Sequence, residues 1–255
     1  EDGFLVAGGF NDQIFDSKIG IKPNFKNKKG SFLTKYDRNG VVKWMVSTEH
    51  EPVVRDRDKI FCSVVDHDGN IYISGTHQGI FIDNTGNRIK IEPIIGENRN
   101  TGYVMKMDKK GKIIWTLSFS TLGYVAEKLY IDKENNLVTI GPFDSQYSGG
   151  QLYLNGVKTE VIKLLAGGFM MMKIAPTGAV KWFDEISISY VNAGGLTDVG
   201  FDRDNNIYLG GNYEMFVSFY SAGNAAPVQT LEGDGGYGSR GFLAKYNKDG
   251  IFQWK

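Results

Sequence analysis

The chain alternates, over its whole length, between short apolar runs and clusters of Asp, Asn and Gly. Runs such as Ile71–Ile73 are β-branched and aromatic, and Phe32–Tyr36 mixes apolar with polar residues, as β-strands do. The clusters between them, for example Asp37–Gly40 and His67–Asn70, contain the residue types that tolerate the left-handed backbone of hairpin turns. No window shows sustained helical periodicity. The pattern therefore predicts an all-β protein built of antiparallel hairpins.

One hairpin phrase occurs four times in the sequence. Its copies read F-L-T-K-Y-D-R-N-G-V-V-K-W, Y-V-M-K-M-D-K-K-G-K-I-I-W, M-M-M-K-I-A-P-T-G-A-V-K-W and F-L-A-K-Y-N-K-D-G-I-F-Q-W. Each copy ends in one of the four tryptophans of the chain, which are Trp44, Trp115, Trp182 and Trp254. Four residues before each tryptophan stands a glycine, in turn Gly40, Gly111, Gly178 and Gly250. The tryptophans are 71, 67 and 72 residues apart, so a supersecondary unit repeats along the chain.

A second phrase lies between the tryptophans. It reads V-V-D-H-D-G-N-I-Y-I-S-G in its first complete copy and ends at Gly75, Gly141 and Gly211, while the chain opens inside it and reaches Gly8. These glycines are 67, 66 and 70 residues apart, in step with the tryptophans. Each repeat of about 66–73 residues therefore predicts four core strands, of which the first is present in three copies and the others in four.

Four antiparallel strands per repeat, with no helices, are typical of a β-propeller blade. One repeat is too small to bury its own faces, so neighbouring repeats must share a core. We expect a single domain over residues 1–255 with about four blades. Trp44, Trp115 and Trp182 should be buried at equivalent positions, as large apolar plates between blades. A piece of a longer propeller and a closed four-bladed ring both fit this pattern, and the first is favoured.

The two phrases together, D-x-D-G-N-I-Y-I-S-G and F-L-x-K-Y-D-x-x-G-x-x-x-W, resemble the SBBP-type β-propeller repeats of secreted and surface bacterial proteins. The spacer element Ile80–Asp83 also resembles those of long surface repeat proteins from Bacteroidetes. This resemblance covers nearly the whole chain and implies an extracellular or cell-surface location. A second resemblance, to PQQ-type propeller repeats, rests only on the Gly-x-x-x-Trp step. That family has its aspartate four residues before the glycine, whereas Asp37 stands three residues before Gly40, so this resemblance ranks second.

The segments between the two hairpins vary in length and composition. They are Phe10–Gly30, His77–Thr101, Pro142–Gly167 and Asn212–Gly241. The second and third contain paired apolar stretches, which predict an extra hairpin on one edge or face, and the Gly- and Ala-rich fourth predicts a mobile loop. Because loops carry function on rigid scaffolds and aromatic residues dominate binding sites, the candidate partner-binding residues are the spacer aromatics Tyr147, Tyr153, Tyr213, Phe216, Tyr220 and Tyr237. Packing of these rings onto the blades is the alternative.

The composition argues against several classes of function. Lys plus Arg equals Asp plus Glu at 29 each, which argues against a protein that binds nucleic-acid backbones. No apolar run approaches the roughly 18 residues of a membrane-spanning helix, so no membrane insertion is predicted. The single cysteine, Cys62, and three histidines lack metal-ligand spacing, and no nucleophile motif or phosphate loop is present. We therefore assign no catalytic, cofactor-binding or metal-binding residues.

Two repeated polar features offer alternatives to this interpretation. Asp66-x-Asp68-x-Asn70 resembles the start of a calcium loop, but His77 stands where a closing acid belongs, so structural turns are favoured over calcium. The repeated lysines could line one face as a basic ring that binds an anion or a glycan carboxylate, although a solvated amine on a packed stem is commoner. These lysines are Lys35, Lys106, Lys173 and Lys245.

The sequence thus favours a non-enzymatic binding or structural module of a secreted or cell-surface bacterial protein, which presents inter-strand loops to a protein or glycan partner. A propeller enzyme (lyase, glycosidase or quinoprotein-like), an assembly factor and a virion or appendage component are the alternatives. An enzyme would need acids, His or Arg converging at one place, and the sequence shows no such unique cluster. The partner and the oligomeric state stay open.

Overall fold

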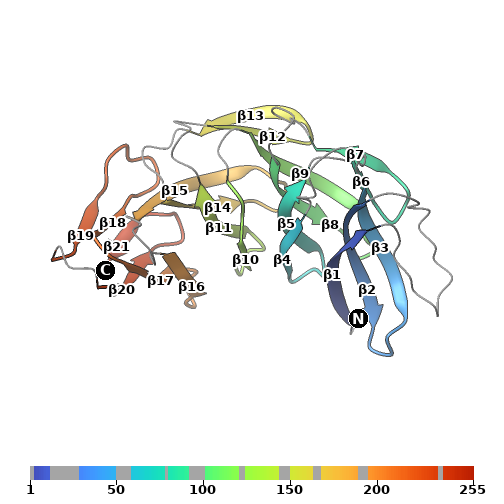
Figure 1. Ribbon diagram of the computed structural model, residues 1–255, viewed down its shortest axis with the longest axis horizontal. Coiled ribbons are helices and arrows are strands. Elements are labelled where there is room, and N and C mark those ends of the chain that lie inside the picture. Colours follow the sequence, from blue (N-terminus) through green and yellow to red (C-terminus); the bar gives the residue numbers. More distant parts are fainter. Residues whose placement is uncertain are drawn as a thin grey trace.

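The computed structural model describes residues 3–11, 29–49, 59–77, 80–91, 101–120, 124–143, 150–162, 168–188, 195–234 and 238–255. These residues form 21 strands, arranged in four antiparallel sheets, and no helix (Figure 1). The prediction of an all-β protein is confirmed. Among these residues there is no helix with the length and apolar character needed to cross a bilayer.

The first two sheets contain the N-terminal half of the chain. The first sheet has, in spatial order, β1 (Gly3–Asn11), β2 (Lys29–Asp37), β3 (Val42–Glu49), β6 (Ile80–Ile82) and β7 (Arg88–Lys90). The second sheet has β13 (Val157–Ile162), β12 (Gly150–Leu154), β9 (Ile113–Ser120), β8 (Thr101–Met107), β5 (Ile71–His77) and β4 (Lys59–Val65).

The last two sheets contain most of the C-terminal half. The third sheet has β10 (Lys128–Ile131), β11 (Leu137–Phe143), β14 (Gly168–Ile174), β15 (Val180–Ile188), β18 (Phe216–Phe219) and β19 (Gln229–Glu232). The fourth sheet has β16 (Gly195–Phe201), β17 (Ile207–Tyr213), β20 (Arg240–Tyr246) and β21 (Phe252–Trp254). The second, third and fourth sheets each contain four core strands of one repeat, as predicted, and the first sheet contains three.

Each spacer hairpin joins the sheet of the preceding repeat. The predicted hairpins β6–β7 and β12–β13 are present, and they pair with the tryptophan-bearing strands β3 and β9, for example through Ser47↔Ile82 and Leu152↔Phe119. The expectation of a mobile loop in the fourth spacer is wrong for residues 216–232, because β18 and β19 form a hairpin that pairs with β15. Val217 and Phe219 on this hairpin are fully buried, which stabilises it.

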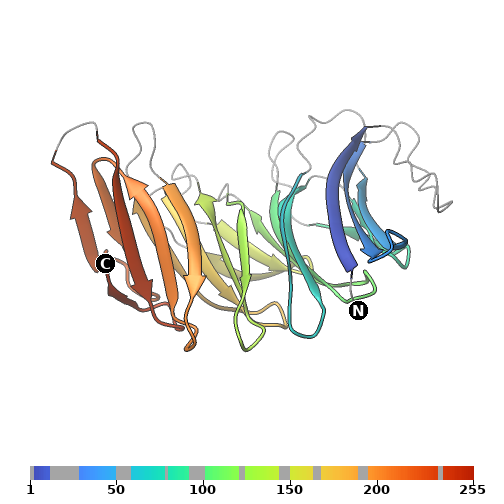
Figure 2. The same ribbon diagram turned by 90° about the horizontal axis from the view of Figure 1, so that it is seen from below.

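The four sheets lie side by side in chain order and form an open arc, with the first and fourth sheets at opposite ends (Figures 1 and 2). One apolar cluster fills each of the three junctions between neighbouring sheets. Met170 and Met172 point into the junction between the second and third sheets, and Met171 into the next one. The three consecutive methionines therefore pack in the core.

Candidate functional site: a basic cleft between the first two sheets

The repeated tryptophan joins each sheet to the next. Its indole Nε1 donates a hydrogen bond to a main-chain carbonyl in the following repeat, from Trp44 to Lys109 (2.9 Å), from Trp115 to Pro176 (3.0 Å) and from Trp182 to Lys248 (3.2 Å). Trp44 and Trp115 are 3% exposed, as predicted, whereas Trp182 is half-buried and only partly meets that expectation.

The glycine of the repeated turn is required by its contact and by its backbone. Gly40, Gly111, Gly178 and Gly250 all have φ between 76° and 91°, in the left-handed region that favours glycine. A Cβ on Gly111 would lie 2.7 Å from the indole of Trp44, so a side chain there would push the two sheets apart. Gly111, Gly178 and Gly250 thus each lie against the tryptophan of the preceding copy, and these contacts join successive sheets.

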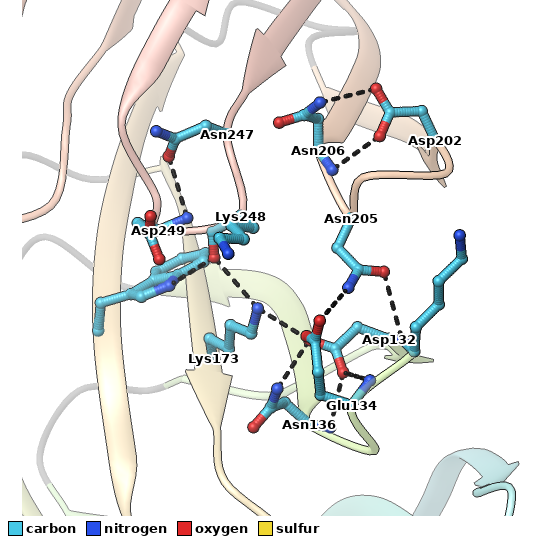
Figure 3. A network of polar contacts seen from close by, with 12 residues as sticks. Asp132, Glu134, Asn136, Lys173, Asp202, Asn205, Asn206, Asn247, Lys248 and Asp249 are labelled. Carbon is cyan, nitrogen blue, oxygen red and sulfur yellow. Dashed lines mark hydrogen bonds and ion pairs between the residues drawn. The ribbon is translucent and has the colours of Figure 1, made fainter.

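Three of the four repeated lysines are neutralised inside their own sheets. Lys106 pairs with Asp66 (3.4 Å), Lys173 with Asp132 (2.8 Å) and Lys245 with Asp202 (3.5 Å). A ring of four available cations is therefore wrong as a description of these lysines. Figure 3 shows Lys173 between the Asp132 carboxylate and the main-chain carbonyl of Lys248, to which it donates at 3.1 Å.

The aspartates that receive these lysines also organise the D-x-D-G-N turns. Oδ1 of Asp132 accepts from the main-chain N–H groups of Glu134 and Asn136, and Oδ2 accepts from the Asn136 amide (Figure 3). Burial opposes ionisation of this carboxyl, but the bonds from Lys173 and Asn136 together outweigh it and hold the pKa of Asp132 below its ordinary value. The same bonding recurs at Asp66 and Asp202, so the calcium-like pattern forms the same hydrogen-bonded turn in three sheets.

Successive turns are also linked to one another by asparagine side chains. Asn135 accepts from the main-chain N–H of His67 and donates to the Asp68 carboxylate. Asn205 repeats this arrangement one sheet later, accepting from Lys133 N–H and donating to Glu134 (Figure 3). These contacts fix the spacing of the second, third and fourth sheets.

Lys35 differs from its three counterparts. No ion pair of Lys35 occurs within the described part of the chain, and its side chain lines a cleft of about 730 Å³ between the first and second sheets. Five of the nine lining residues are basic and one is acidic. The lining consists of Lys35, Asp37, Arg38, Asn39, Lys43, Trp44, Asn84, Lys109 and Lys110.

The one carboxylate in this lining is already engaged. Asp37 pairs with Lys43 at 3.1 Å and accepts hydrogen bonds from the main-chain N–H groups of Asn39 and Val41. The Val41 bond, supported by Lys43, holds the pKa of Asp37 below its ordinary value. Lys35, Arg38, Lys109 and Lys110 therefore leave the cleft with an excess of positive charge.

A smaller cleft of about 490 Å³ continues from the first. It shares Lys35 and Lys109 with the larger cleft and adds His67 and Asp68 from the D-x-D-G-N turn. The two lysines therefore stand where the clefts meet, and a ligand longer than one cleft would contact both of them.

The loop backbones of the larger cleft are held in place independently of its charged groups. The main-chain carbonyls of Lys109 and Lys110 accept from Trp44 Nε1 and from the Asn84 amide (2.9 Å each), and Asn84 N–H donates to the Gly111 carbonyl. Because the backbone of the turn makes these contacts, the lysine side chains are not needed for them. The site is a preformed surface of cations on a fixed turn.

Sequence reasoning missed this cleft because it weighed the charge of the whole chain. A signal was present in the repeats, since the two middle residues of the turn are Lys109 and Lys110 in the second copy but Pro176 and Thr177 in the third. Lys43, likewise, corresponds to Ile114 in the second copy. Comparing the charge of equivalent turn positions would have singled out the junction between the first and second sheets.

The candidate partner-binding aromatics do not gather in one place. Tyr213 and Tyr220 are 6% and 7% exposed, and the Tyr213 ring packs against Phe242. Phe216 is 38% exposed on β18 of the third sheet, whereas Tyr153 is half-buried on β12 of the second sheet. Tyr147 and Tyr237 lie outside the described residues. Partner binding by this set stays a prediction, and packing accounts for its buried members.

Asp184 is the most unusual titratable residue of the described chain. It is 3% exposed on β15, and its Oδ2 has no hydrogen-bond partner in the part of the structure that is described. Burial, reinforced by the charge of Glu185, raises the pKa of Asp184 to about 8, although the Glu185 N–H opposes the shift. Tyr246, whose pKa is also raised by burial and then by Asp184, is equally enclosed. Both side chains are buried away from solvent, and neither lines one of the two clefts.

No group of three or more His, Cys, Asp or Glu side chains placed to hold a metal ion occurs within the described ranges. A comparison with protein-family models finds no match for the chain, and a comparison with curated proteins finds no similar sequence. The functional argument therefore rests on the geometry of the basic cleft.

Proposed function

We propose that this protein is a non-enzymatic binding module of the β-propeller type and that the cleft between its first two sheets binds an acidic glycan. The observation that carries the proposal is the excess of cations around the cleft, five basic residues against one carboxylate that is already paired. Uronic acid residues carry one carboxylate per sugar ring and many hydroxyl groups, so they match cations placed among main-chain and amide donors.

The chemistry of the individual side chains supports this ligand class. The Arg38 guanidinium can engage a carboxylate through two parallel hydrogen bonds, while Lys35 and Lys109 supply point charges that tolerate varied ligand positions. A cleft of about 730 Å³ accommodates a short oligosaccharide rather than a single ion. Hydrolysis of a glycan normally uses two carboxyl groups, whereas this lining has one, so the site is suited to binding.

The propeller part of the proposal is supported by the way the sheets stack. Four-stranded antiparallel units follow one another in chain order, and a repeated tryptophan fills each junction. The open arc means that these four sheets do not by themselves form a ring (Figure 1). The resemblance of the two phrases to SBBP-type repeats supports a place on the cell surface or outside the cell, where acidic glycans are abundant.

The proposal is tested by titrating the protein with oligogalacturonate at low salt in a calorimeter. A Lys35→Ala/Lys109→Ala variant should bind at least ten-fold more weakly, because it removes both lysines that the two clefts share. A matched control is Lys181→Ala/Lys248→Ala, which removes two lysines from the junction between the third and fourth sheets and should bind like the native protein.

Three further outcomes test the proposal. Raising the salt concentration should weaken binding, because exposed charges are screened over about 10 Å at 0.1 M ionic strength. Equal losses in the cleft variant and the control variant would mean that only overall charge matters, and the proposed site would be abandoned. Tight binding of an acidic peptide with none of oligogalacturonate would assign the cleft to a protein partner.

A further inference from the structure

The outer face of the fourth sheet exposes residues whose counterparts in the other sheets are buried or half-buried. Two positions before the repeated lysine stand Leu33, Val104 and Met171, which are 1%, 0% and 0% exposed, whereas Leu243 at the same position is 51% exposed. Trp254 is 42% exposed, while Trp115 at the same position is 3% exposed. Leu243 and Trp254 are therefore uncovered apolar side chains on this face.

The outer face of the first sheet likewise exposes residues whose counterparts in the second sheet are buried. Phe4 and Val6 are 49% and 38% exposed, although Ile71 and Ile73 at the equivalent positions of the second sheet are 1% and 0% exposed. A Cβ on Gly40 would have nothing within 4 Å, whereas those on Gly111, Gly178 and Gly250 would meet the preceding tryptophan. The first sheet thus exposes the surface that receives a tryptophan elsewhere.

The junctions inside the protein show that these two surfaces fit each other. Between the first and second sheets, Leu33 and Trp44 share one apolar cluster with Ile71, Ile73 and Met107. Leu243 and Trp254 occupy the positions of the first pair, and Phe4 and Val6 occupy positions of the second group. Val104 and Trp115 pack in the same way against residues of the third sheet. The chain thus contains both halves of an interface that it already forms internally.

The pairing of β21 differs from that of the other tryptophan strands. The tryptophan strands β3, β9 and β15 each pair on their outer side with a hairpin from the next repeat. In the described part of the chain, β21 pairs with β20 alone. An unpaired strand edge next to an exposed apolar face is a surface prepared for another β-structure.

We infer that the chain associates with a second copy of itself head to tail, the outer face of the fourth sheet of one copy packing on the outer face of the first sheet of the next. Trp254 then lies against Gly40 and Leu243 against Phe4 and Val6, as their counterparts do inside one chain. The interface joins two different surfaces, so association ends in a ring where the rotation closes and continues as a filament where it does not. This inference goes beyond the proposed glycan binding. Phe4 also lines the smaller cleft, whereas Val6, Leu243 and Trp254 line neither cleft.

Sedimentation and light scattering of the purified chain over a range of micromolar concentrations test it. The native chain should show species of at least twice 28.4 kDa, with a fraction that grows with concentration. Trp254→Glu and Val6→Glu should each remain a monomer, because each places a charge in one half of the apolar interface. Both residues are exposed, so neither change removes a core contact. Val157→Glu, at a 67% exposed position on the β12–β13 hairpin, should associate like the native chain.

Mixing the two monomeric variants provides the decisive observation. Each variant keeps one intact face, so the mixture should form one junction and give a 1:1 complex of about twice 28.4 kDa. Formation of this complex also shows that both variants are folded. A native chain that stays a monomer at every concentration would overturn the inference, and so would a Trp254→Glu variant that associates like the native chain or a mixture that forms no complex.

Discussion

Trp115 and Trp254 occupy the same place in two copies of one sequence phrase, yet their surroundings differ. Within its sheet each has the same neighbours, since the rings of Tyr72 and Trp115 are 5.8 Å apart at 68° and those of Tyr208 and Trp254 are 5.9 Å apart at 67°. Trp115 is 3% exposed because the third sheet covers it, and Trp254 is 42% exposed. The phrase therefore determines the arrangement within a sheet, while the neighbouring sheet determines how much each residue stabilises the fold.

The largest expected difference is between the two tryptophans themselves. Trp115→Ala should lower the free energy of unfolding by about 3–5 kcal/mol, because it leaves a cavity between two sheets and removes the bond to the Pro176 carbonyl. Trp254→Ala should cost less than about 1 kcal/mol when it is measured at a concentration low enough to keep the chain monomeric. Urea denaturation of the two variants measures both values, and equal losses would contradict the assigned junctions.

The buried ion pairs provide a second test of the same contrast. The side chains of Lys173 and Asp132 are 5% and 0% exposed, whereas those of Lys245 and Asp202 are 21% and 29% exposed. Asp132→Asn should lower the free energy of unfolding by about 3 kcal/mol, because it leaves a buried lysine without a countercharge. Asp202→Asn should cost clearly less. Thermal melts of the two variants side by side compare them, and a larger loss from Asp202→Asn would refute the ranking.

We predict that Asp184 makes the stability of the protein depend on pH. The equivalent position in the second sheet is Leu117, which does not titrate. The pKa of the Asp184 carboxyl is about 8 in the folded protein and near 3.8 in the unfolded chain, so between these values the folded state binds the extra proton. Stability should therefore fall as pH rises through this window, by up to about 1.4 kcal/mol per pH unit. Denaturation of the native protein at pH 5 and pH 8 measures the change.

The matched variant for this experiment is Asp184→Leu, which restores the residue type of the second sheet. It should be more stable than the native protein at pH 7 and should lose the part of the pH dependence that Asp184 contributes. Glu185 lies beside Asp184 and titrates in both proteins, so the difference between the two pH profiles isolates Asp184. Parallel profiles would show that this carboxyl keeps its ordinary pKa.

The sequence predicts local structure here better than contacts between repeats. The hairpins follow from turn chemistry, since Asp37 and Gly40 define a turn whatever surrounds it. The destination of the spacer hairpins was not predictable, because pairing with the preceding sheet depends on how the sheets are stacked. The fourth spacer was expected to be a mobile loop, but Val217 and Phe219 are fully buried because their hairpin pairs with the preceding sheet.

The polar sites also depend on contacts between distant residues, which the sequence does not predict. The Lys–Asp pairs were missed because Lys106 and Asp66 are 40 residues apart and meet only when β5 and β8 pair. The basic cleft was missed because Lys35 and Lys109 belong to different repeats and meet only in the folded chain. The whole chain has equal numbers of basic and acidic residues, which hides this local excess of positive charge. Each of these features depends on which strands become neighbours in space.

The smallest expected effect is that of removing calcium. Chelation should change the stability of neither the repeated turns nor the rest of the molecule. In each turn the first aspartate already accepts hydrogen bonds from main-chain amides and an asparagine, as Asp66 does from Asp68, Asn70 and the Asn70 amide at 2.8–3.0 Å. Calcium needs six to eight oxygen ligands, and a carboxylate engaged in this way has little capacity left. Thermal melts in calcium and in excess chelator should therefore coincide. A melting temperature that falls by many degrees on chelation would show that these turns hold a metal, and the turn chemistry would then have to be reinterpreted as a ligand set.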